Sequence, residues 1–251
     1  MSEVRKLGVD DLSWGTGTWT SPAGMVVTRI PVASPTGNMF MGVYDVKAYG
    51  AVGDNVTDDT AAIQAVIDVA YAAGGGVVLL PAATYRVINL ILKDGVVLYG
   101  SPGGYGYQVS SIERTVLRAY AAGIIVDTPA GGTTGAAILG IDFQGLGAGT
   151  AVKGIRLRAG NWNQIKNVHL NNMSDEGIVI SAGKADVIED VLATNCVLDR
   201  TQAAVIGAVD IGGTDHYLNR IEATVSGSTE GTVQSVNLYH VGILIRARTI
   251  S

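Results

Sequence analysis

The residues of this sequence best suited to chemistry accompany a repeated apolar motif in the second half of the chain. The motif has the form apolar-x-x-apolar-x-apolar, and its copies follow one another at spacings of 27, 23 and 30 residues. The copies are Ile138–Phe143, Ile165–Leu170, Ile188–Ala193 and Leu218–Ala223. This spacing is typical of a stacked solenoid, in which each copy is one coil that cannot bury its apolar side alone. The position after the central apolar residue then points outward, which predicts a row made of Asp142, His169, Leu192 and Glu222.

The acids and the imidazole near this row suit acid–base chemistry on a sugar chain. Coils stack about 4.8 Å apart, so Asp142 and His169 are expected on adjacent coils, with Asp175 and Glu176 in the turn that follows His169. Paired carboxylates hydrolyse glycosides when one protonates the leaving oxygen while the other activates water or attacks the sugar. We predict Asp142, His169, Asp175 and Glu176 as catalytic residues; the alternative is that they are solvated charges on the outside of the solenoid.

Two arginines on a neighbouring segment suit the binding of an acidic sugar. Arg156 and Arg158 alternate with apolar residues on one expected strand, so both side chains point outward. Lyase chemistry needs cations that stabilise the substrate acid in addition to a base that takes the proton. We predict Arg156, Arg158 and Glu222 as substrate-binding residues, with ordinary surface charge as the alternative.

The elements that must position these residues begin with the stretch from Tyr44 to Val87. Apolar residues at i, i+3, i+4, i+7 and i+8 predict one short helix with a single buried stripe. The stripe consists of Ile63, Val66, Ile67, Ala70 and Tyr71. Thr57 or Asp58 can cap the helix start, Asp58 and Asp59 suit the positive end of the dipole, and the glycines at 74–76 end the helix. Two strand-like runs follow, over 77–81 and 84–87.

The same stretch resembles the opening of a known protein family. The string Tyr49-Gly50-Ala51-Val52-Gly53-Asp54, followed by 57–60, 62–64 and 75–85, resembles the start of the pectate-lyase-like superfamily, which includes many phage tailspikes. The resemblance implies an all-β fold, a right-handed parallel β-helix (solenoid) with a short N-terminal capping α-helix, and it also implies a homotrimer. Two positions depart from the family pattern: Asn55 stands where Gly is usual, and Ala82-Ala83 stand where Pro-Gly is usual. Asn tolerates a positive φ, so the first change is mild.

Residues 1–40 differ in character from the rest of the chain. They are rich in turn residues, which predicts an irregular N-terminal arm and a candidate virion-attachment segment. Trp14 and Trp19 in this arm are either packing residues or anchors on a partner. Residues 41–251 are predicted to form the β-helix domain, with a cap over 44–90 and coils over 91–251. No amphipathic stretch follows Ile245, so we expect the solenoid to continue, or to be covered, beyond the last residue.

Composition narrows the classes of partner. Glycine is 34 of 251 residues and charged residues are 16%, against ordinary values of ~7% and ~25%, which indicates many tight turns and few solvated faces. A net charge of −5 without a basic cluster argues against nucleic acid and against an anionic membrane surface. The chain has no apolar run long enough to span a bilayer.

Cysteine and histidine usage adds three expectations. The single cysteine, Cys196, has no partner for an internal disulfide, and no apolar signal core follows residues 1–6, so we expect the chain to fold in a cytoplasm. His169, His216 and His240 do not have the spacing of metal ligands. No metal and no cofactor are therefore predicted.

These observations favour a phage tailspike or tail-fibre protein that assembles in the host cytoplasm and becomes part of the virion tail. Its expected role is host attachment: it recognises a bacterial surface polysaccharide, and its acidic residues make depolymerisation of that polysaccharide an open expectation. Its expected partners are the polysaccharide, other phage tail proteins bound through the arm, and further copies of the chain. One alternative is a purely structural attachment module without activity. Another is a cellular polysaccharide lyase or glycoside hydrolase, against which the absence of an export signal weighs.

Overall fold

A computed structural model of the chain describes residues 42–101, 114–196, 209–212, 217–223, 236–239 and 246–249, together with 18–20 and 26–28. The chain divides into two units, Met1–Phe40 and Met41–Ser251. In the first unit, β1 (Thr18–Thr20) and β2 (Val26–Thr28) form an antiparallel pair. Trp14, one of the two proposed anchors, lies outside the described residues. Within the described part of the chain, no helix has the length and apolar character needed to cross a membrane.

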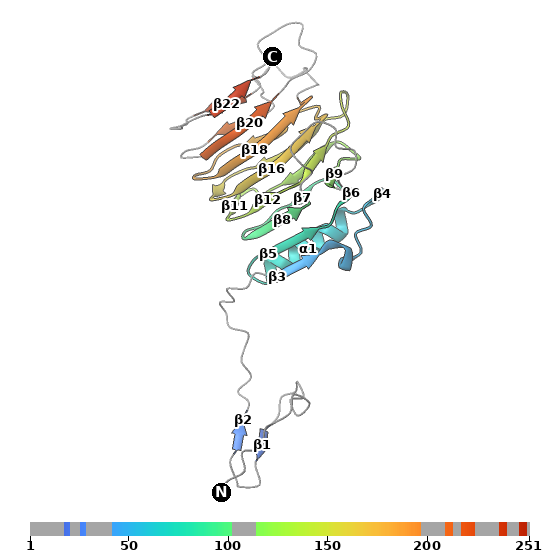
Figure 1. The fold of residues 1–251 in the computed structure, drawn as a ribbon, viewed down its shortest axis with the longest axis vertical. Coiled ribbons are helices and arrows are strands. Elements are labelled where there is room, and N and C mark those ends of the chain that lie inside the picture. Colours follow the sequence, from blue (N-terminus) through green and yellow to red (C-terminus); the bar gives the residue numbers. More distant parts are fainter. Residues whose placement is uncertain are drawn as a thin grey trace. The chain divides into compact units, whose positions relative to one another are not determined.

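The second unit is a right-handed parallel β-helix, as the sequence predicted (Figure 1). Its strands stack coil upon coil into three faces. Face 1 contains β7 (Leu90–Ile91), β10 (Gly123–Asp127), β14 (Val152–Leu157), β17 (Ile178–Ile180), β19 (Val209–Gly212) and β21 (Val236–Tyr239). Face 2 contains β3 (Gly42–Asp45), β5 (Gly76–Leu80), β8 (Val96–Gly100), β12 (Ala137–Leu139) and the first halves of β16 (Gln164–Asn171), β18 (Val187–Thr194) and β20 (Tyr217–Ala223).

Face 3 carries the row that the sequence singled out. It contains β4 (Asp54–Asp58), β6 (Ala83–Arg86), β9 (Thr115–Arg118), β13 (Asp142–Gln144), the second halves of β16, β18 and β20, and β22 (Arg246–Thr249). A small pair, β11 (Thr133–Thr134) and β15 (Gly160–Asn161), stacks at the corner between faces 1 and 2.

The interior of the stack is apolar, as the motif predicted. The first and central apolar residues of every copy are at most 4% exposed. These residues are Ile138, Ile141, Ile165, Val168, Ile188, Val191, Leu218 and Ile221. Fully burying a side chain of this size stabilises a fold by roughly 1.5–3 kcal/mol, so this column contributes substantially to the stability of the solenoid.

A column of left-handed residues turns each coil from face 2 to face 3. Gly140, Asn167, Asp190 and Arg220 have φ values of 66°, 53°, 56° and 50°, and the strand register places them at equivalent positions of successive coils. A single left-handed residue bends an extended chain without ending its pairing on either side. The long strands β16, β18 and β20 therefore serve two faces each.

The predicted helix covers the first coil. It is α1 (Thr60–Ala72), and Ile63, Val66, Ile67 and Ala70 are fully buried beneath it. The prediction for Tyr71 was wrong: its side chain is 47% exposed, and its ring lies beside the ammonium of Lys93, 5.2 Å from the ring centroid. Tyr71 belongs to the last turn of α1, at the end of the predicted stripe.

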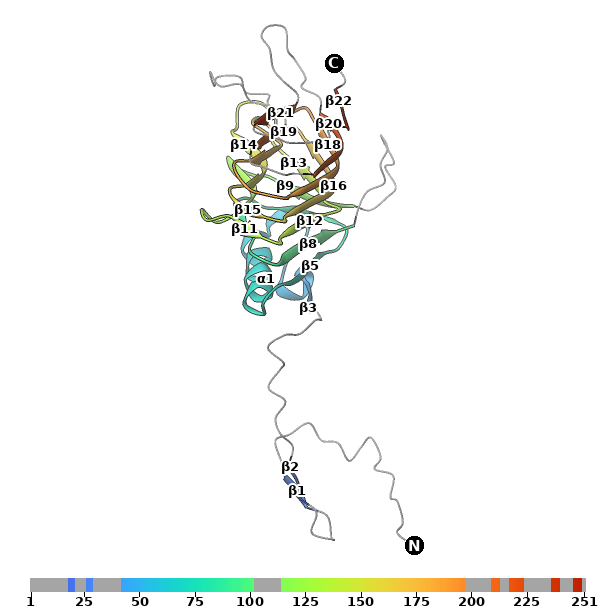
Figure 2. The same cartoon turned by 90° about the vertical axis from the view of Figure 1, so that its left-hand side faces the viewer.

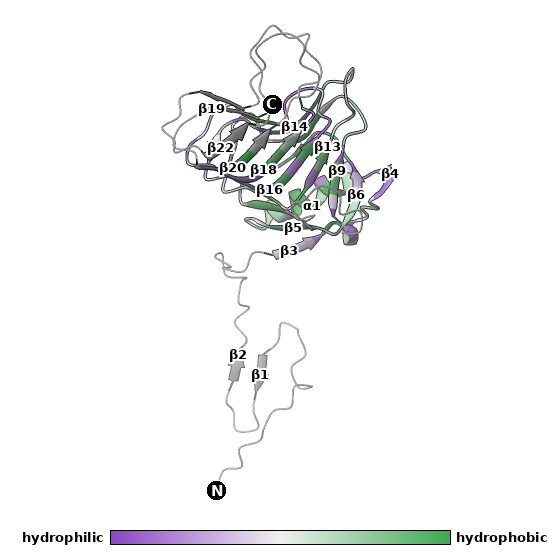
Figure 3. Cartoon of the chain, turned by 45° about the horizontal axis from the view of Figure 1, so that its top comes forward, coloured by the Kyte–Doolittle hydropathy of each residue, from purple (hydrophilic) through white to green (hydrophobic). Residues whose placement is uncertain are grey.

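The start of α1 was predicted only in part. Asp58 accepts a hydrogen bond from the Thr60 backbone N–H at 2.9 Å, which is a helix-start contact of the expected kind. Asp59 occupies the N-cap position of α1, but its carboxylate makes no cap hydrogen bond: it is buried and accepts the backbone N–H groups of Val52 (2.6 Å) and Gly53 (3.0 Å). The residues immediately before Asp59 form the exposed strand β4, which is strongly hydrophilic in Figure 3.

Helix α1 lies at the N-terminal end of the stack (Figure 2), and its polar side chains also bind the edge of face 1. The Gln64 side chain accepts the Ile91 backbone N–H at 2.8 Å and donates to the Ile91 carbonyl at 3.2 Å. The Thr60 hydroxyl accepts the Ile88 backbone N–H at 3.2 Å. An uncovered strand edge is a template for pairing with another chain, so the helix satisfies the backbone groups that the first coil leaves open.

Candidate functional site

The strand register on face 3 brings together the row of residues expected from the motif. Asp142 is paired with His169, His169 with Leu192, and Leu192 with Glu222. The backbone of Glu222 is part of β20, while its side chain lies outside the described residues. The row runs on in the other direction, because Asp142 is also paired with Val116 of β9.

Asp142 lies between a guanidinium and an imidazole. Arg114 Nη1 lies 2.8 Å from Asp142 Oδ2, and His169 Nδ1 lies 3.8 Å from the same oxygen. The other ring nitrogen of His169, Nε2, is 3.0 Å from the hydroxyl of Thr194. Thr194 therefore holds the orientation of the imidazole. The separation of 3.8 Å is longer than a direct hydrogen bond.

A second outward row runs beside the first, two residues further along each strand. Arg118 is paired with Gln144, Gln144 with Asn171, and Asn171 with Thr194. These side chains are donors or acceptors of the kind that recognise sugar hydroxyl and carboxylate groups. Face 3 therefore presents one continuous line of polar groups along the axis of the stack, beside a first row in which Asp142 and His169 lie between Val116 and Leu192.

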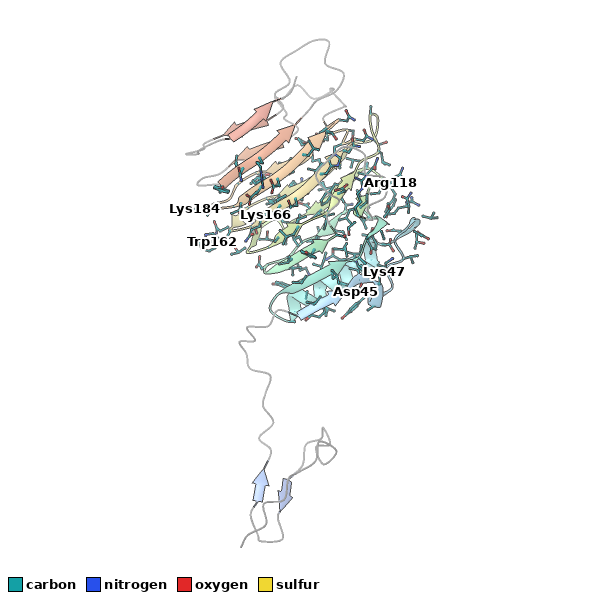
Figure 4. All side chains as sticks on the ribbon, in the orientation of Figure 1. Asp45, Lys47, Arg118, Trp162, Lys166 and Lys184 are labelled. Atoms are coloured by element: carbon teal, nitrogen blue, oxygen red, sulfur yellow. The ribbon has the colours of Figure 1, made fainter. Side chains whose placement is uncertain are left out.

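An open groove of about 430 Å³ lies on face 3 next to Asp142, and Figure 4 labels Arg118, one of its residues. The groove is lined by Asn55, Ala82, Ala83, Thr84, Arg114, Val116, Arg118 and Gln144. Arg118 Nη1 donates to Asn55 Oδ1 at 3.2 Å, and the ion pairs of the described residues give Arg118 no carboxylate partner. The groove thus combines an available guanidinium with amide groups, and the described residues that line it include no acid.

The predicted acids Asp175 and Glu176 lie elsewhere, in the turn that leads from face 3 to face 1. Lys153 Nζ contacts both carboxylates. It lies 2.7 Å from Asp175 Oδ2 and also forms an ion pair with Glu176 Oε2. Burial, supported by the hydrogen bond with Asp175, raises the pKa of Glu176 to about 7. For Asp175 burial acts in the same direction, but hydrogen bonds with Glu176 and Lys153 outweigh it and hold its pKa below the ordinary value. This cluster is a half-buried acid pair around one ammonium, with Lys153 on β14 of face 1.

The predicted substrate-binding arginines share one buried carboxylate. Arg156 donates to Asp127 from Nε (2.9 Å) and Nη2 (2.6 Å), and Arg158 does so from the same atoms at 3.2 and 2.8 Å. Burial opposes ionisation of Asp127, but the hydrogen bonds from both arginines outweigh it and lower its pKa. A role for Arg156 and Arg158 in binding substrate remains a prediction, and the contact that the structure gives them is structural.

Sequence reasoning missed the residues that surround Asp142 and His169. Arg114 and Arg118 flank Val116, and extending the outward row by one coil toward the N-terminus would have found them. Thr194 occupies the second outward position of its strand, the same position as Arg118. Asp127 stands one coil before Arg156, where the apolar motif has no copy to set the register.

Fold and site together define a β-helix protein of the pectate-lyase type, with a polar groove along one face of the coil stack. The chain belongs to the family described as rhamnogalacturonase A/epimerase, pectate lyase-like, whose profile matches residues 43–242. Among characterised relatives, mannuronan C5-epimerase AlgE4 of Azotobacter vinelandii is 56% identical over 69 residues, which is 24% of this chain and 12% of that protein. The chain therefore spans a small part of the length of the relative it matches.

Solved structures show the same fold over most of the chain. The A-module of Azotobacter vinelandii mannuronan C-5 epimerase AlgE4 is similar with a TM-score of 0.54 and 25% identity, covering 79% of this chain and 52% of that one. A tailspike protein, gp49 from Acinetobacter baumannii bacteriophage Fri1, is similar with a TM-score of 0.51 and 16% identity, covering 79% of this chain and 40% of that one. The tailspike is described as a capsular polysaccharide depolymerase, and at this identity the likeness concerns the fold alone.

Proposed function

We propose that this protein binds an acidic polysaccharide along face 3 and acts on it by proton transfer at Asp142 and His169. The observation that carries the proposal is the groove beside Asp142, where Arg118 is a cation without a carboxylate partner in the described structure. A guanidinium recognises a carboxylate through two parallel hydrogen bonds. A uronate sugar, which has one carboxylate per ring, matches this arrangement.

The reaction class that suits these groups is removal of the proton next to the uronate carboxylate. Hydrolysis by the usual route needs two carboxyl groups flanking the glycosidic bond. On the described part of face 3, Asp142 is the carboxylate beside an imidazole, whereas Asp54 and Asp58 of β4 accept hydrogen bonds from neighbouring backbone and hydroxyl groups. In the proposed step His169 takes the proton from the sugar carbon, and the electron pair moves into the substrate carboxylate, whose charge Arg118 offsets. Asp142 stabilises the imidazolium that forms on His169. In epimerisation the carbanion takes a proton from water on the opposite face of the ring, and His169 returns its proton to solvent. In elimination the carbanion expels the neighbouring glycosidic oxygen, which takes the proton from His169.

The similarity to a mannuronan C5-epimerase supports this choice, because mannuronan is a polymer of a uronic acid. Mannuronan is therefore the first substrate to test. Elimination produces unsaturated uronates that absorb ultraviolet light, epimerisation changes the proton NMR spectrum without new chain ends, and hydrolysis releases reducing ends.

Matched variants test the proposed roles. His169→Ala and Asp142→Asn should each lower turnover by about 10²-fold or more, the usual contribution of a positioned acid or base. Arg118→Ala should weaken binding of mannuronan, and the loss should shrink at high salt because screening already weakens the wild-type contact. Arg220→Ala is the control, since it removes the same charge from the left-handed column between faces 2 and 3. Unchanged turnover in both His169→Ala and Asp142→Asn would show that the chemistry occurs elsewhere.

A place on a phage tail is a second proposal, supported by the solved tailspike with this fold and by the division of the chain at residue 40. In this role the N-terminal arm binds other tail proteins, the chain forms a homotrimer, and face 3 recognises a bacterial surface polysaccharide during host attachment. Light scattering coupled to size exclusion measures the oligomeric state, and a monomer at micromolar concentration would count against the tail role. Cosedimentation of the full chain, and of a chain lacking residues 1–40, with purified phage tails tests the attachment.

A further inference from the structure

Trp162 is an exposed aromatic residue whose position the fold does not explain. It lies in the turn between β15 and β16, its side chain is 65% exposed, and its φ is 56°. Its backbone N–H donates to the Lys184 carbonyl at 3.1 Å. Across the described residues, the indole itself makes no hydrogen bond and no ring contact. In Figure 4 it lies at the opposite edge of the coil stack from Arg118 of the groove.

The neighbours of Trp162 show that the fold does not need a tryptophan there. The pairing of β11 with β15, and the bridge from Asn161 to Lys184, place Gly135 and Ala185 at the equivalent corner positions of the adjacent coils. Both share its left-handed backbone, with φ values of 66° and 59°. Glycine adopts this conformation without strain, whereas a bulky side chain at positive φ is strained. A strained residue that contributes little packing indicates a role outside folding.

We propose that Trp162 is the platform of a second polysaccharide-binding site, separate from the groove on face 3. A sugar ring has a flat face of C–H groups and a rim of hydroxyl groups, so it stacks on an exposed indole while its rim reaches polar neighbours. The column of residues immediately before the corner supplies such neighbours: Thr134, Asn161 and Lys184 stack at equivalent positions of three coils. Lys184 adds a cation, which suits a chain of acidic sugars.

The surroundings of Trp162 favour a glycan over a protein partner. Aromatic residues that anchor protein interfaces lie at the centre of apolar, water-excluding patches. Trp162 instead lies beside Asn161 along the chain and beside small residues across the coils. A single aromatic ring with one adjacent amide matches one sugar ring at a time. The inference takes the class of ligand, an acidic polysaccharide, from the proposed function and does not otherwise depend on it.

The test compares binding by the full-length chain in native gels containing mannuronan, with dextran as the neutral glycan. Trp162→Gly should bind mannuronan at least about fivefold more weakly, because an anchoring aromatic residue contributes a large share of the binding energy. Trp162→Phe should keep most of the binding. Tyr217→Ala, which removes an exposed aromatic of similar exposure (55%) from face 2, should bind like the wild-type chain.

Stability and assembly measurements separate the roles. The melting temperature of Trp162→Gly should equal or exceed that of the wild type, because glycine already occupies the adjacent corner. The proposal is overturned if Trp162→Gly binds with wild-type affinity, or if neither gel retards the unmodified chain. It is also overturned if the loss of binding is accompanied by a smaller particle in light scattering, because Trp162 would then be a protein contact. A further loss when Trp162→Gly is combined with Arg118→Ala supports two separate sites, whereas a defect in Arg118→Ala alone supports only the groove.

Discussion

Replacing Glu176 by Gln should flatten the dependence of stability on pH. The pKa of Glu176 is raised to about 7 in the folded chain by burial and by the hydrogen bond with Asp175, whereas the ordinary value is 4.5. Between these values the folded chain keeps a proton that the unfolded chain has released. The stability contributed by this proton is fully present below pH 4.5 and is lost as the pH rises through about 7.

The magnitude follows from the difference between the two pKa values. Each pKa unit corresponds to about 1.4 kcal/mol, so a difference of about 2.5 units corresponds to roughly 3 kcal/mol between pH 4 and pH 8. Asp175 does not contribute a slope in this window, because its pKa is lowered and it is ionised in both states. Lys153 titrates far above the window, because its pKa is raised. Glu176→Gln should therefore gain stability relative to the wild type by about that amount as the pH increases.

Urea unfolding followed by circular dichroism at pH 5, 6, 7 and 8 measures the effect. Glu189→Gln is the matched control, since a hydrogen bond from Asn219 lowers the pKa of Glu189 and keeps its titration below the window. Parallel stability curves for the wild type and Glu176→Gln across this range would refute the reasoning. Such a result would mean that Glu176 is ionised in the folded chain and that Lys153 fully compensates its burial.

Three further substitutions test the fold. Ile67→Asp buries an unpaired charge under the first coil and should lower the free energy of unfolding in urea by several kcal/mol. Val69→Asp, on the exposed side of α1, is its control. Equal stability of the two variants would contradict the role of the helix as a cap. Asp127→Asn should cost about 3 kcal/mol, because it leaves two guanidinium groups with a neutral partner, and a melting temperature equal to that of the wild type would contradict this. Gln64→Ala should cost about 1–2 kcal/mol by freeing the backbone groups of Ile91, and hydrogen exchange at that amide should accelerate.

The course of the solenoid was predictable because side chains alternate along a strand and coils repeat. Once Ile165 and Val168 were assigned to the interior, His169 had to point outward, and its alignment with Asp142 followed from the spacing of the copies. Helix α1 was predictable from its stripe, whereas the exposure of Tyr71 was not. The stripe gives the direction of a side chain and does not give the extent of the core beneath it.

The contacts within the candidate site depended on distances that periodicity does not contain. Arg114 immediately precedes β9, and its reach to Asp142 depends on a long side chain crossing one coil. The attachment of Arg156 and Arg158 to Asp127 depends on which residue lies one coil before them, where the sequence offers no repeated motif. Asp59 was assigned to the helix start by its position in the sequence. Its carboxylate instead accepts two backbone N–H groups of the loop at Val52.

The parallel pairing of the coils also determines how the molecule carries mechanical load. Backbone hydrogen bonds join each strand to the equivalent strand of the next coil, so they run along the axis of the stack. Tension applied along that axis acts on the coil junctions in series, and the weakest junction opens first while the others remain closed. Tension applied along the strands of one junction instead loads all of its hydrogen bonds at once. A polysaccharide chain held along the strands and one held along the axis would therefore pull on the same protein with different resistance.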